Sequence, residues 1–472
     1  MDGILTGPDL GFSFAAAWQG LYGMAYLPVV IFCLALVFGT KPVKAARAAL
    51  SVGIAFIGVV LVIGMFWSVL GDVSQAIAAR TGIERDVIDM GWPTAATIAF
   101  GSQVGLWVIP IGLAVNIALL LTGITRTMNV DIWNYWHFAL IGALVLAATG
   151  SLVMGLGTVA LIAALSLFFS DWCARAVQRF YGIPGVSVPH ILSVQVLPIA
   201  IAVNWMIEKI PFLRGLDANA ETVTRRLGIL GDPTALGFFL GLGLGMIGFL
   251  DLDNPVTTSV NAFAVGVSLA AGMMLLPYVL KILMEGLIPV TDGARQFVER
   301  RLGKREVTIG LDSSIVIGHP SAMASALILI PVAIALSVLL PGNRVLVFTD
   351  LVVIPFIVAL AAPIVRGNVV RMVLIGTVTL TLGFYIATAL SATFTLAAVD
   401  AGIAQPANGT ELTAMGDGFV WVTYLAVALT QGLGYAGLAI FAALIAGAFA
   451  LLHRYRAALE RAAGADDPPK ED

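Results

Sequence analysis

Long apolar runs alternate with short polar segments along almost the whole chain. Most runs reach about 18 residues, the length at which an α-helix can cross a bilayer. The pattern predicts helices at 21–39, 48–70, 104–122, 137–152, 153–170, 233–250, 257–277, 321–340, 346–365, 372–397 and 420–450. Segment 190–207 is also long enough to cross, but Pro198 interrupts it. The chain is therefore predicted to be an all-α polytopic membrane protein with about eleven transmembrane helices, in a range of about ten to twelve.

The same order of segments occurs in both halves of the chain. Span 48–70 is followed by a mildly charged stretch, then by GWPTAATIAFGSQ, and then by three spans. Span 257–277 is followed by a charged stretch, then by LDSSIVIGHPSA, and then by three spans. Because the first charged stretch is expected outside and the second inside, this order predicts an inverted repeat, with repeat one at about 48–170 and repeat two at about 257–397.

Each half contains a short polar segment with a proline directly after its charged stretch, at 91–103 and at 311–322. Such a segment cannot face lipid, because its backbone N–H and C=O groups would have no partners there. It can persist inside protein or beside a water-filled cavity. We therefore predict two re-entrant hairpins whose tips meet from opposite sides of the membrane.

Composition supports the membrane assignment. Hydrophobic residues make up 59% of the chain and charged residues 11%, whereas soluble domains carry about 25% charged residues. The net charge of −3 and the lack of a basic stripe give no reason to expect a nucleic-acid partner. Cys33 and Cys173 lie far apart in the sequence and are interpreted as packing residues.

The loop charges predict the orientation of the chain. Lys and Arg gather at residues 41–47, 295–305, 366–371 and 454–456, whereas 399–418 contains only acidic charges. The positive-inside rule then places the N-terminus outside and the C-terminus in the cytoplasm. We divide the chain into an extension at 1–20 without the features of a signal peptide, a single membrane unit at 21–452 and a cytoplasmic tail at 453–472.

The segment NVDIWNYWH, Asn129 to His137, combines hydrogen-bonding side chains with aromatic rings between two apolar runs. Tryptophan and tyrosine at the lipid headgroups would explain the rings. A polyol site would explain the whole segment, since aromatic rings cover the C–H face and polar groups pair with the hydroxyls. An unpaired buried hydroxyl costs on the order of 1–3 kcal/mol, so a polyol site must supply such groups. The aspartate, asparagine and histidine side chains of the segment could supply these groups, but spacing alone does not show which of them point inward.

Three of the four histidines, His137, His190 and His319, occur at polar breaks between apolar runs. A lone histidine in a membrane protein is more often a structural donor than a ligand. A zinc site has little support, because no two of the three have i, i+3 or i+4 spacing, and no metal is expected. Asp312 lies at membrane depth, where an ionisable residue indicates a functional site, although it can also cap a helix.

Familiar enzyme motifs are absent from the sequence. GLGMIG at 243–248 matches a dinucleotide-binding pattern but lies in an apolar helix without alternating strands. The chain has no P-loop, no HExxH motif and no recognisable Ser-His-Asp arrangement. No cofactor is therefore expected.

Several short motifs occur in an order that resembles a known family. The motifs are GWP at 91–93, NVDIWNYWH at 129–137, PH at 189–190, EKIP at 208–211, GDP at 231–233, the GLD…GH run at 310–319, PGN at 341–343 and RGN at 366–368. From about residue 25 to about residue 450, the chain resembles the galactitol-type IIC permeases of the bacterial phosphoenolpyruvate-dependent phosphotransferase system, which share a superfamily with the ascorbate permeases.

The resemblance implies an elevator-type core domain, a second domain for homodimerisation, and a place in the bacterial inner membrane. It also implies group translocation, in which the IIC chain binds a sugar or polyol from outside and carries it inward. A separate IIB protein, itself served by IIA, then phosphorylates the sugar from its own cysteine. The IIC chain would be a transporter subunit, and whether it counts as an enzyme stays open.

The resemblance also carries the family's binding site onto this chain. The implied sugar-binding residues are Trp92, Thr94, Asp131, Asn134, His137, His190, Gln195, Asp312 and His319. His190, His319 and Asp312 are the candidates for accepting the hydroxyl proton. The residues after GWP and after Pro-His depart from the family pattern, so a polyol other than galactitol or a pentose-derived substrate is open. An ion-coupled sugar transporter that needs no IIB protein, and a sugar receptor, are the alternatives.

Overall fold

The computed structural model of the chain describes residues 28–29, 31–33, 35–37, 39–81, 86–129, 131–215, 233–302, 307–317, 319–347, 349–403 and 409–465. The predicted extension at 1–20, most of the predicted span at 21–39 and the end of the cytoplasmic tail lie outside these residues. Helices dominate the described part, so the prediction of a polytopic helical membrane protein is confirmed at this level.

Short strands and helices alternate in the first half of the chain. Its elements are β1 (Val87–Asp89), α3 (Trp92–Gly101), α4 (Gly105–Leu121), β2 (Thr127–Asn129), η1 (Ile132–Asn134), α5 (Tyr135–Thr149), α6 (Leu152–Tyr181), β3 (Val186–Ser187), α7 (Ile191–Val194), α8 (Val196–Lys209) and α9 (Pro211–Arg214). Local signals set the helix ends. The Ser151 hydroxyl accepts a hydrogen bond from the Met154 N–H at the start of α6, and Gly182 ends α6 in the left-handed conformation.

The second half repeats this order of elements. It contains β4 (Thr308–Gly310), α13 (Ser314–Ile317), α14 (Pro320–Leu339), β5 (Val345–Leu346), η3 (Thr349–Val353), α15 (Ile354–Ala359), α16 (Val369–Asp400), β6 (Glu411–Thr413), α17 (Trp421–Leu433) and α18 (Tyr435–Ala462). In both halves a first strand precedes two consecutive helices, and a second strand leads into a 3-10 turn and a helix. A third strand then precedes a broken helix.

Six strands form two small parallel sheets, which the all-α prediction missed. β1 lies between β5 and β6, and β4 lies between β2 and β3. In each sheet the central strand is the first strand of one half, and its neighbours are the second and third strands of the other half. The two halves are thus joined by a reciprocal exchange of strands. Strands of two or three residues are too short to give an alternating pattern in the sequence.

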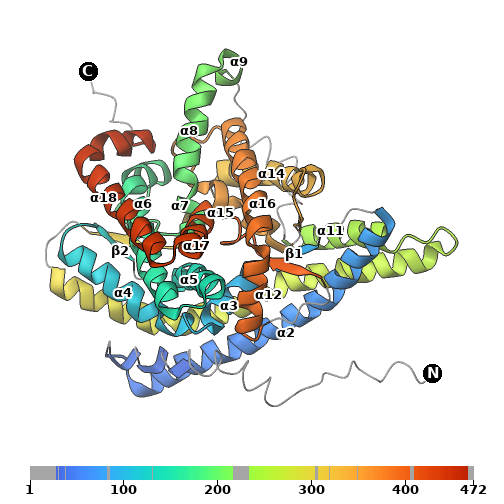
Figure 1. Cartoon of the computed structure of the whole chain (residues 1–472), viewed down its shortest axis with the longest axis horizontal. Helices are drawn as coiled ribbons and strands as arrows, with labels where there is room; N and C mark the ends of the chain where they lie inside the picture. Colours follow the sequence, from blue (N-terminus) through green and yellow to red (C-terminus); the bar gives the residue numbers. More distant parts are fainter. Residues whose placement is uncertain are drawn as a thin grey trace.

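Three further helices form a bundle along one flank of the molecule. α2 (Pro42–Thr81), α11 (Pro233–Gly248) and α12 (Pro255–Leu302) pack against one another, and α2 runs beside α12 in Figure 1. Close packing of α11 on α12 depends on small residues, because a Cβ atom at Gly241 would lie 2.7 Å from the Cα of Gly266. The predicted span 257–277 and most of the charged stretch after it form one helix, because α12 continues to Leu302.

The predicted span 346–365 is wrong. The chain there forms η3, the six-residue α15 and a series of turns. Pro355 and Pro363 interrupt regular helix, and Arg366 adopts a left-handed φ of 54°. The apolar side chains of this segment, such as Ile357 and Val358, are buried in the protein core. Its hydrophobicity therefore reflects protein packing instead of contact with lipid.

Several predicted helices differ in position from the candidate spans of the described residues. Among the described residues, six helices are long and apolar enough to cross a membrane, and the bent pair of α3 and α4 makes a seventh. The predicted span 420–450 is two helices, α17 and α18, separated at Gly434. Segment 190–207, whose crossing the sequence does not decide, corresponds to a candidate span at Ile191–Lys209. α5 and α17 have fewer than 18 residues and do not reach this length.

Between β1 and α3, the conformation of Gly91 explains part of the GWP motif. Its φ of 80° is rare for residues with a side chain, and an added Cβ atom would lie 2.5 Å from Cγ2 of Thr349. We expect Gly91→Ala to destabilise the protein by about 1–3 kcal/mol or more, because strain and a steric clash coincide. Thermal unfolding in detergent measures this effect. Gly243→Ala, inside α11 with no atom within 4 Å of its Cβ position, is the control and should unfold at or above the wild-type temperature.

Candidate functional site

One of the two sheets brings together three polar breaks of the sequence. Asp131 follows β2, His190 follows β3 and Asp312 follows β4. Because all three strands run parallel, their carboxyl ends lie at the same edge of the sheet. The loops after parallel strands are a common place for ligand sites in proteins. The sequence contained these residues, but no strand had been predicted to connect them.

His137 and His190 are in direct contact. Their Nε2 atoms lie 3.1 Å apart, and both side chains are buried. On its other side, Nδ1 of His137 lies 2.9 Å from Oδ1 and 3.0 Å from Oδ2 of Asp417. Nδ1 of His190 lies 3.1 Å from the Ser193 hydroxyl. Four side chains from α5, the β3–α7 turn, α7 and the loop before α17 thus form one buried network.

The hydrogen-bond partners assign the protons of a neutral histidine pair. The carboxylate of Asp417 only accepts, so Nδ1–H of His137 donates to it and Nε2 of His137 is left as an acceptor. Nε2–H of His190 then donates to His137, and Nδ1 of His190 accepts from Ser193. Ser313 extends the chain, because its hydroxyl donates to the Ser193 hydroxyl over 2.7 Å. All bonds run in one direction, an arrangement in which each bond polarises the next.

Asp312 borders this network. Its Oδ2 lies 3.5 Å from Nε2 of His190, and its Oδ1 accepts from the N–H of Ser314 over 2.6 Å. The N–H of Asp312 in turn donates to Oδ2 of Asp131 over 3.0 Å. The capping interpretation of Asp312 is therefore confirmed, and its second carboxylate oxygen faces His190.

Three tryptophans lie beside the histidines. The ring of Trp136 stacks on His137 with centroids 3.7 Å apart. The ring of Trp92 lies 6.4 Å from that of Trp136 and 6.1 Å from that of Trp133. Trp92, the first residue of α3, thus lies against two tryptophans of the segment at 129–137. The aromatic surface and the hydrogen-bonding network adjoin each other, as a site for a polyol requires.

Asn134 is completely buried, and neither its amide nitrogen nor its amide oxygen has a hydrogen-bond partner among the described residues. An unpaired buried polar group costs on the order of 1–3 kcal/mol. Such a group in a native protein indicates a water or a ligand that provides the missing bonds. Of the predicted site residues, Asn134 is the one whose amide group is left to pair with a hydroxyl group.

The remaining predicted residues have other environments. The Thr94 hydroxyl donates to the backbone carbonyl of Met90 over 2.7 Å. Gln195 is buried, and its backbone carbonyl accepts from the indole N–H of Trp421. The structure does not bring His319 to the other two histidines. It caps α14 by accepting from the N–H of Ser321, and it contacts the rings of Phe180 and Tyr181.

Two buried aspartates that bind residues of the candidate site, Asp350 and Asp417, were not predicted as site residues. Asp350 accepts hydrogen bonds from the N–H of Trp92 over 2.7 Å and of Gly416 over 3.2 Å, and its own N–H donates to Asp89. Asp350, in the second half of the chain, therefore binds the start of α3 in the first half. In the same way Asp131, in the first half, binds the backbone of Asp312 in the second half. Asp417 had been noted only as a loop charge. A carboxylate between apolar runs was the available signal for both residues.

The site contains no recognisable metal centre in the part of the chain that the structure describes. Within those residues, no three side chains of His, Cys, Asp and Glu are arranged to hold a metal ion. The arrangement can instead bind hydroxyl groups, exchange a proton between histidine and carboxylate, and cover an apolar face with indole rings.

Comparisons with known proteins agree with the motifs. Residues 24–409 match a family described as "PTS system sugar-specific permease component". The chain is 35% identical over 431 residues to the "PTS system galactitol-specific EIIC component" of Escherichia coli strain K12, an alignment that covers 91% of this chain and 94% of that protein. It is 34% identical over 439 residues to a "Putative permease IIC component" of the same strain, covering 92% and 97% of the two chains.

Proposed function

The chain belongs to the family of sugar-specific IIC permease components of the phosphotransferase system, and from this premise we propose that it carries a neutral polyol of the galactitol type. Membership confirms the resemblance seen in the motifs, the sugar-permease assignment and the placement in a membrane. The family also implies partner proteins of the IIA and IIB classes. The identity of the polyol, the binding residues and the route of the proton are proposals.

The observation that carries the proposal is the buried network of Asp417, His137 and His190 beside three tryptophans. We assign His137, His190, Asn134, Asp312 and Trp92 to the polyol site. A polyol pairs its hydroxyls with the amide of Asn134 and the carboxylate of Asp312 beside the paired histidines, and its C–H face packs on the indoles. A neutral ligand suits a buried site, because burying a further charge would cost much more. The phosphorylated product carries such a charge, which favours its release.

Asp312 is the group best placed to accept the proton of the reacting hydroxyl. Oδ2 of Asp312 is the carboxylate oxygen directed at His190, whereas both nitrogens of His190 are already engaged. The sugar oxygen attacks phosphorus on the IIB cysteine, the P–S bond breaks, the P–O bond forms and the proton passes to Asp312. The IIC chain contributes position and a proton acceptor. His319 is left out of this step, because it caps α14 instead.

We further propose that the two sheets and their helices form the moving core of an elevator, and that α2, α11 and α12 form a homodimer scaffold. The reciprocal exchange of strands supports a rigid core, because the two halves cannot separate without breaking both sheets. The carboxyl-terminal ends of α6, α12 and α18 are rich in arginine, which supports placing these ends on the cytoplasmic side of the bacterial inner membrane. In the proposed orientation the N-terminus lies outside. Inverted orientation of the halves and re-entrant hairpins belong to the same proposal.

The proposal predicts uptake that depends on the partner proteins. In bacterial cells that contain this chain with IIA and IIB, labelled galactitol should accumulate as its phosphate. Removal of IIB should abolish accumulation, because the free polyol is no longer trapped, while galactitol binding to the purified chain persists. Calorimetry with galactitol, other hexitols, pentitols and ascorbate tests the substrate. Uptake that survives without IIB and collapses with the proton gradient would instead support an ion-coupled transporter that uses the same carboxylates.

A further inference from the structure

Arg344 lies where the three strands of the first sheet begin, and it pairs with two carboxylates there. It directly precedes β5, and its Nε donates to Oδ1 of Asp86 over 2.8 Å, while Nη1 lies 3.2 Å from Oε2 of Glu411. Asp86 directly precedes β1, and Glu411 is the first residue of β6. One arginine from an edge strand is thus paired with a carboxylate from each of the other two strands. The hydrogen bond to Asp86 above all raises the pKa of Arg344, so this cation is permanent.

Arg126 holds the equivalent place in the second sheet. It directly precedes β2, as Arg344 precedes β5. In the first sheet, Val87 of the central strand is aligned with Val345 and with Glu411 of its two neighbours. In the second sheet, Thr308 of the central strand is aligned with Thr127 of β2, and Ile309 is aligned with Val186 of β3. This register makes Val307 the counterpart of Asp86 and Gly185 the counterpart of Glu411. Both carboxylates that neutralise Arg344 are therefore missing around Arg126.

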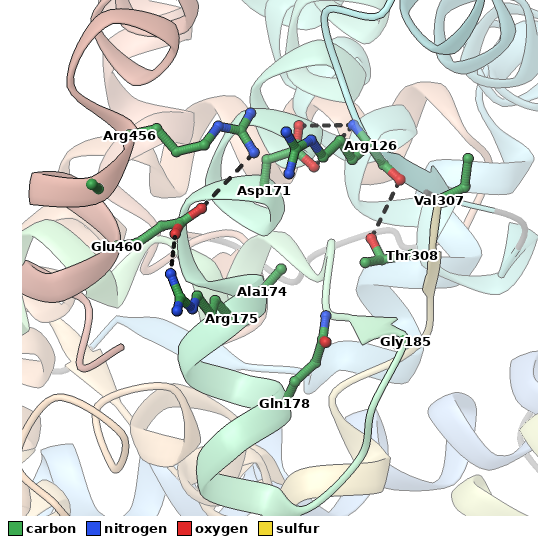
Figure 2. Close-up of a pocket in the computed structure, with 11 residues that line it drawn as sticks. Arg126, Asp171, Ala174, Arg175, Gln178, Gly185, Val307, Thr308, Arg456 and Glu460 are labelled. Carbon is green, nitrogen blue, oxygen red and sulfur yellow. Dashed lines mark hydrogen bonds and ion pairs between the residues drawn. The ribbon is translucent and has the colours of Figure 1, made fainter. Parts of the chain in front are cut away.

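A cavity of about 730 Å³ lies where those carboxylates would be. Arg126, Val307 and Gly185 line it together with Arg175 and Arg456, as Figure 2 shows. This volume lies within the range of about 300–1,000 Å³ that is usual for small-molecule sites. The cavity adjoins the beginnings of the three strands, whereas Asp131, His190 and Asp312 follow their ends. At about 3.3 Å per residue, five residues separate Arg126 from Asp131 by about 16 Å, so this is not the polyol site.

The two acids that line the cavity already have partners. Glu460 lies 3.7 Å from Arg175 and 3.9 Å from Arg456. The carboxylate of Asp171 accepts from the backbone N–H of Arg126 at 3.2 Å and from the hydroxyl of Thr127 at 2.9 Å. The guanidinium of Arg126, by contrast, makes no ion pair with any residue that the structure describes. Among the described residues that line the cavity, three arginines face two carboxylates, and Arg126 is the arginine whose guanidinium has no carboxylate partner.

We propose that this cavity binds an oxyanion of the phosphate type, which Arg126 holds in place of the carboxylates that its counterpart Arg344 has. A guanidinium presents parallel N–H donors that match the oxygens of a phosphate or carboxylate. Arg175 and Arg456, which share Glu460, line the same cavity. The anion comes either from free phosphate and phosphate monoesters, or from the phosphoryl group of a partner protein. The second source rests on the proposed function, and the first does not.

The first test is the binding of inorganic phosphate to the purified full chain in detergent, with sodium chloride added to matched ionic strength. Wild-type protein should bind phosphate, and Arg126→Gln should weaken binding by about tenfold or more, as expected for one lost charge-assisted contact. Val307→Asp should weaken binding similarly, because it restores the carboxylate opposite Arg126. Arg454→Gln, which removes an arginine outside this lining, is the matched control and should bind phosphate as the wild type does.

The second test compares phosphorylated and unphosphorylated IIB protein as ligands of the same variants. If the anion comes from the partner, the phosphorylated form should bind more tightly to wild type, and Arg126→Gln and Val307→Asp should remove this preference. The proposal is overturned if wild-type protein prefers neither phosphate nor the phosphorylated partner, or if both variants bind like wild type. Galactitol binding, measured in parallel, should be the same in all variants. Its failure in wild type would contradict the proposed function and leave the anion site standing.

Discussion

Replacing His190 by alanine should lower polyol uptake by about tenfold to a hundredfold, because it leaves its buried hydrogen-bond partners unpaired at a cost of about 1–3 kcal/mol. His190 contacts His137, Ser193 and Asp312, so its loss removes the centre of the network. Asp312→Asn should have an effect of similar size on uptake, because an amide cannot accept the hydroxyl proton. Uptake of labelled galactitol in cells that contain IIA and IIB is the measurement.

The two variants are expected to differ in binding. Asp312→Asn keeps the shape of the side chain and should still bind galactitol in calorimetry, whereas His190→Ala should bind it weakly. His319→Ser is the matched control, because serine can replace histidine as the cap of α14 and the side chain lies outside the network. Size-exclusion profiles show whether each variant is folded. Near-normal uptake by folded His190→Ala and Asp312→Asn proteins would refute the site.

Asp350→Ala should cause the largest loss of stability among single substitutions in the site region, on the order of 3–5 kcal/mol. The carboxylate of Asp350 is buried and accepts from the N–H groups of Trp92 and Gly416. Alanine would leave both N–H donors unpaired and would remove the hydrogen bond that joins the start of α3 to the second half of the chain. The temperature of unfolding in detergent, followed by tryptophan fluorescence, measures the loss.

Two companion variants separate this effect from a general sensitivity to substitution. Asp350→Asn retains one acceptor oxygen and should fall between alanine and wild type. Asp253→Ala removes an exposed carboxylate before α12 and should leave the unfolding temperature nearly unchanged. If Asp350→Ala unfolds at the same temperature as Asp253→Ala, the hydrogen bonds of Asp350 do not hold the two halves together.

Helix positions could be predicted where periodicity and length agree. The predicted spans 104–122 and 372–397 correspond closely to α4 and α16. Span 346–365 was equally apolar in sequence but proved to be buried protein core. Hydropathy reports that a segment avoids water, and it does not distinguish lipid from the interior of the protein. The same limit explains why 346–365 was predicted to cross the membrane.

The sequence by itself determined the class of the protein and supplied most of the residues of the candidate site. Its apolar composition requires a membrane, and its motifs indicate a sugar permease with His137, His190 and Asp312 among its polar breaks. The tertiary structure decided which breaks meet. Parallel strands of two or three residues exchange between the halves, bring His190 and Asp312 to one edge, and leave His319 elsewhere. Pairing between distant strands leaves no local pattern in a sequence, so contacts such as those of Asp350 and Asp417 become visible only in three dimensions.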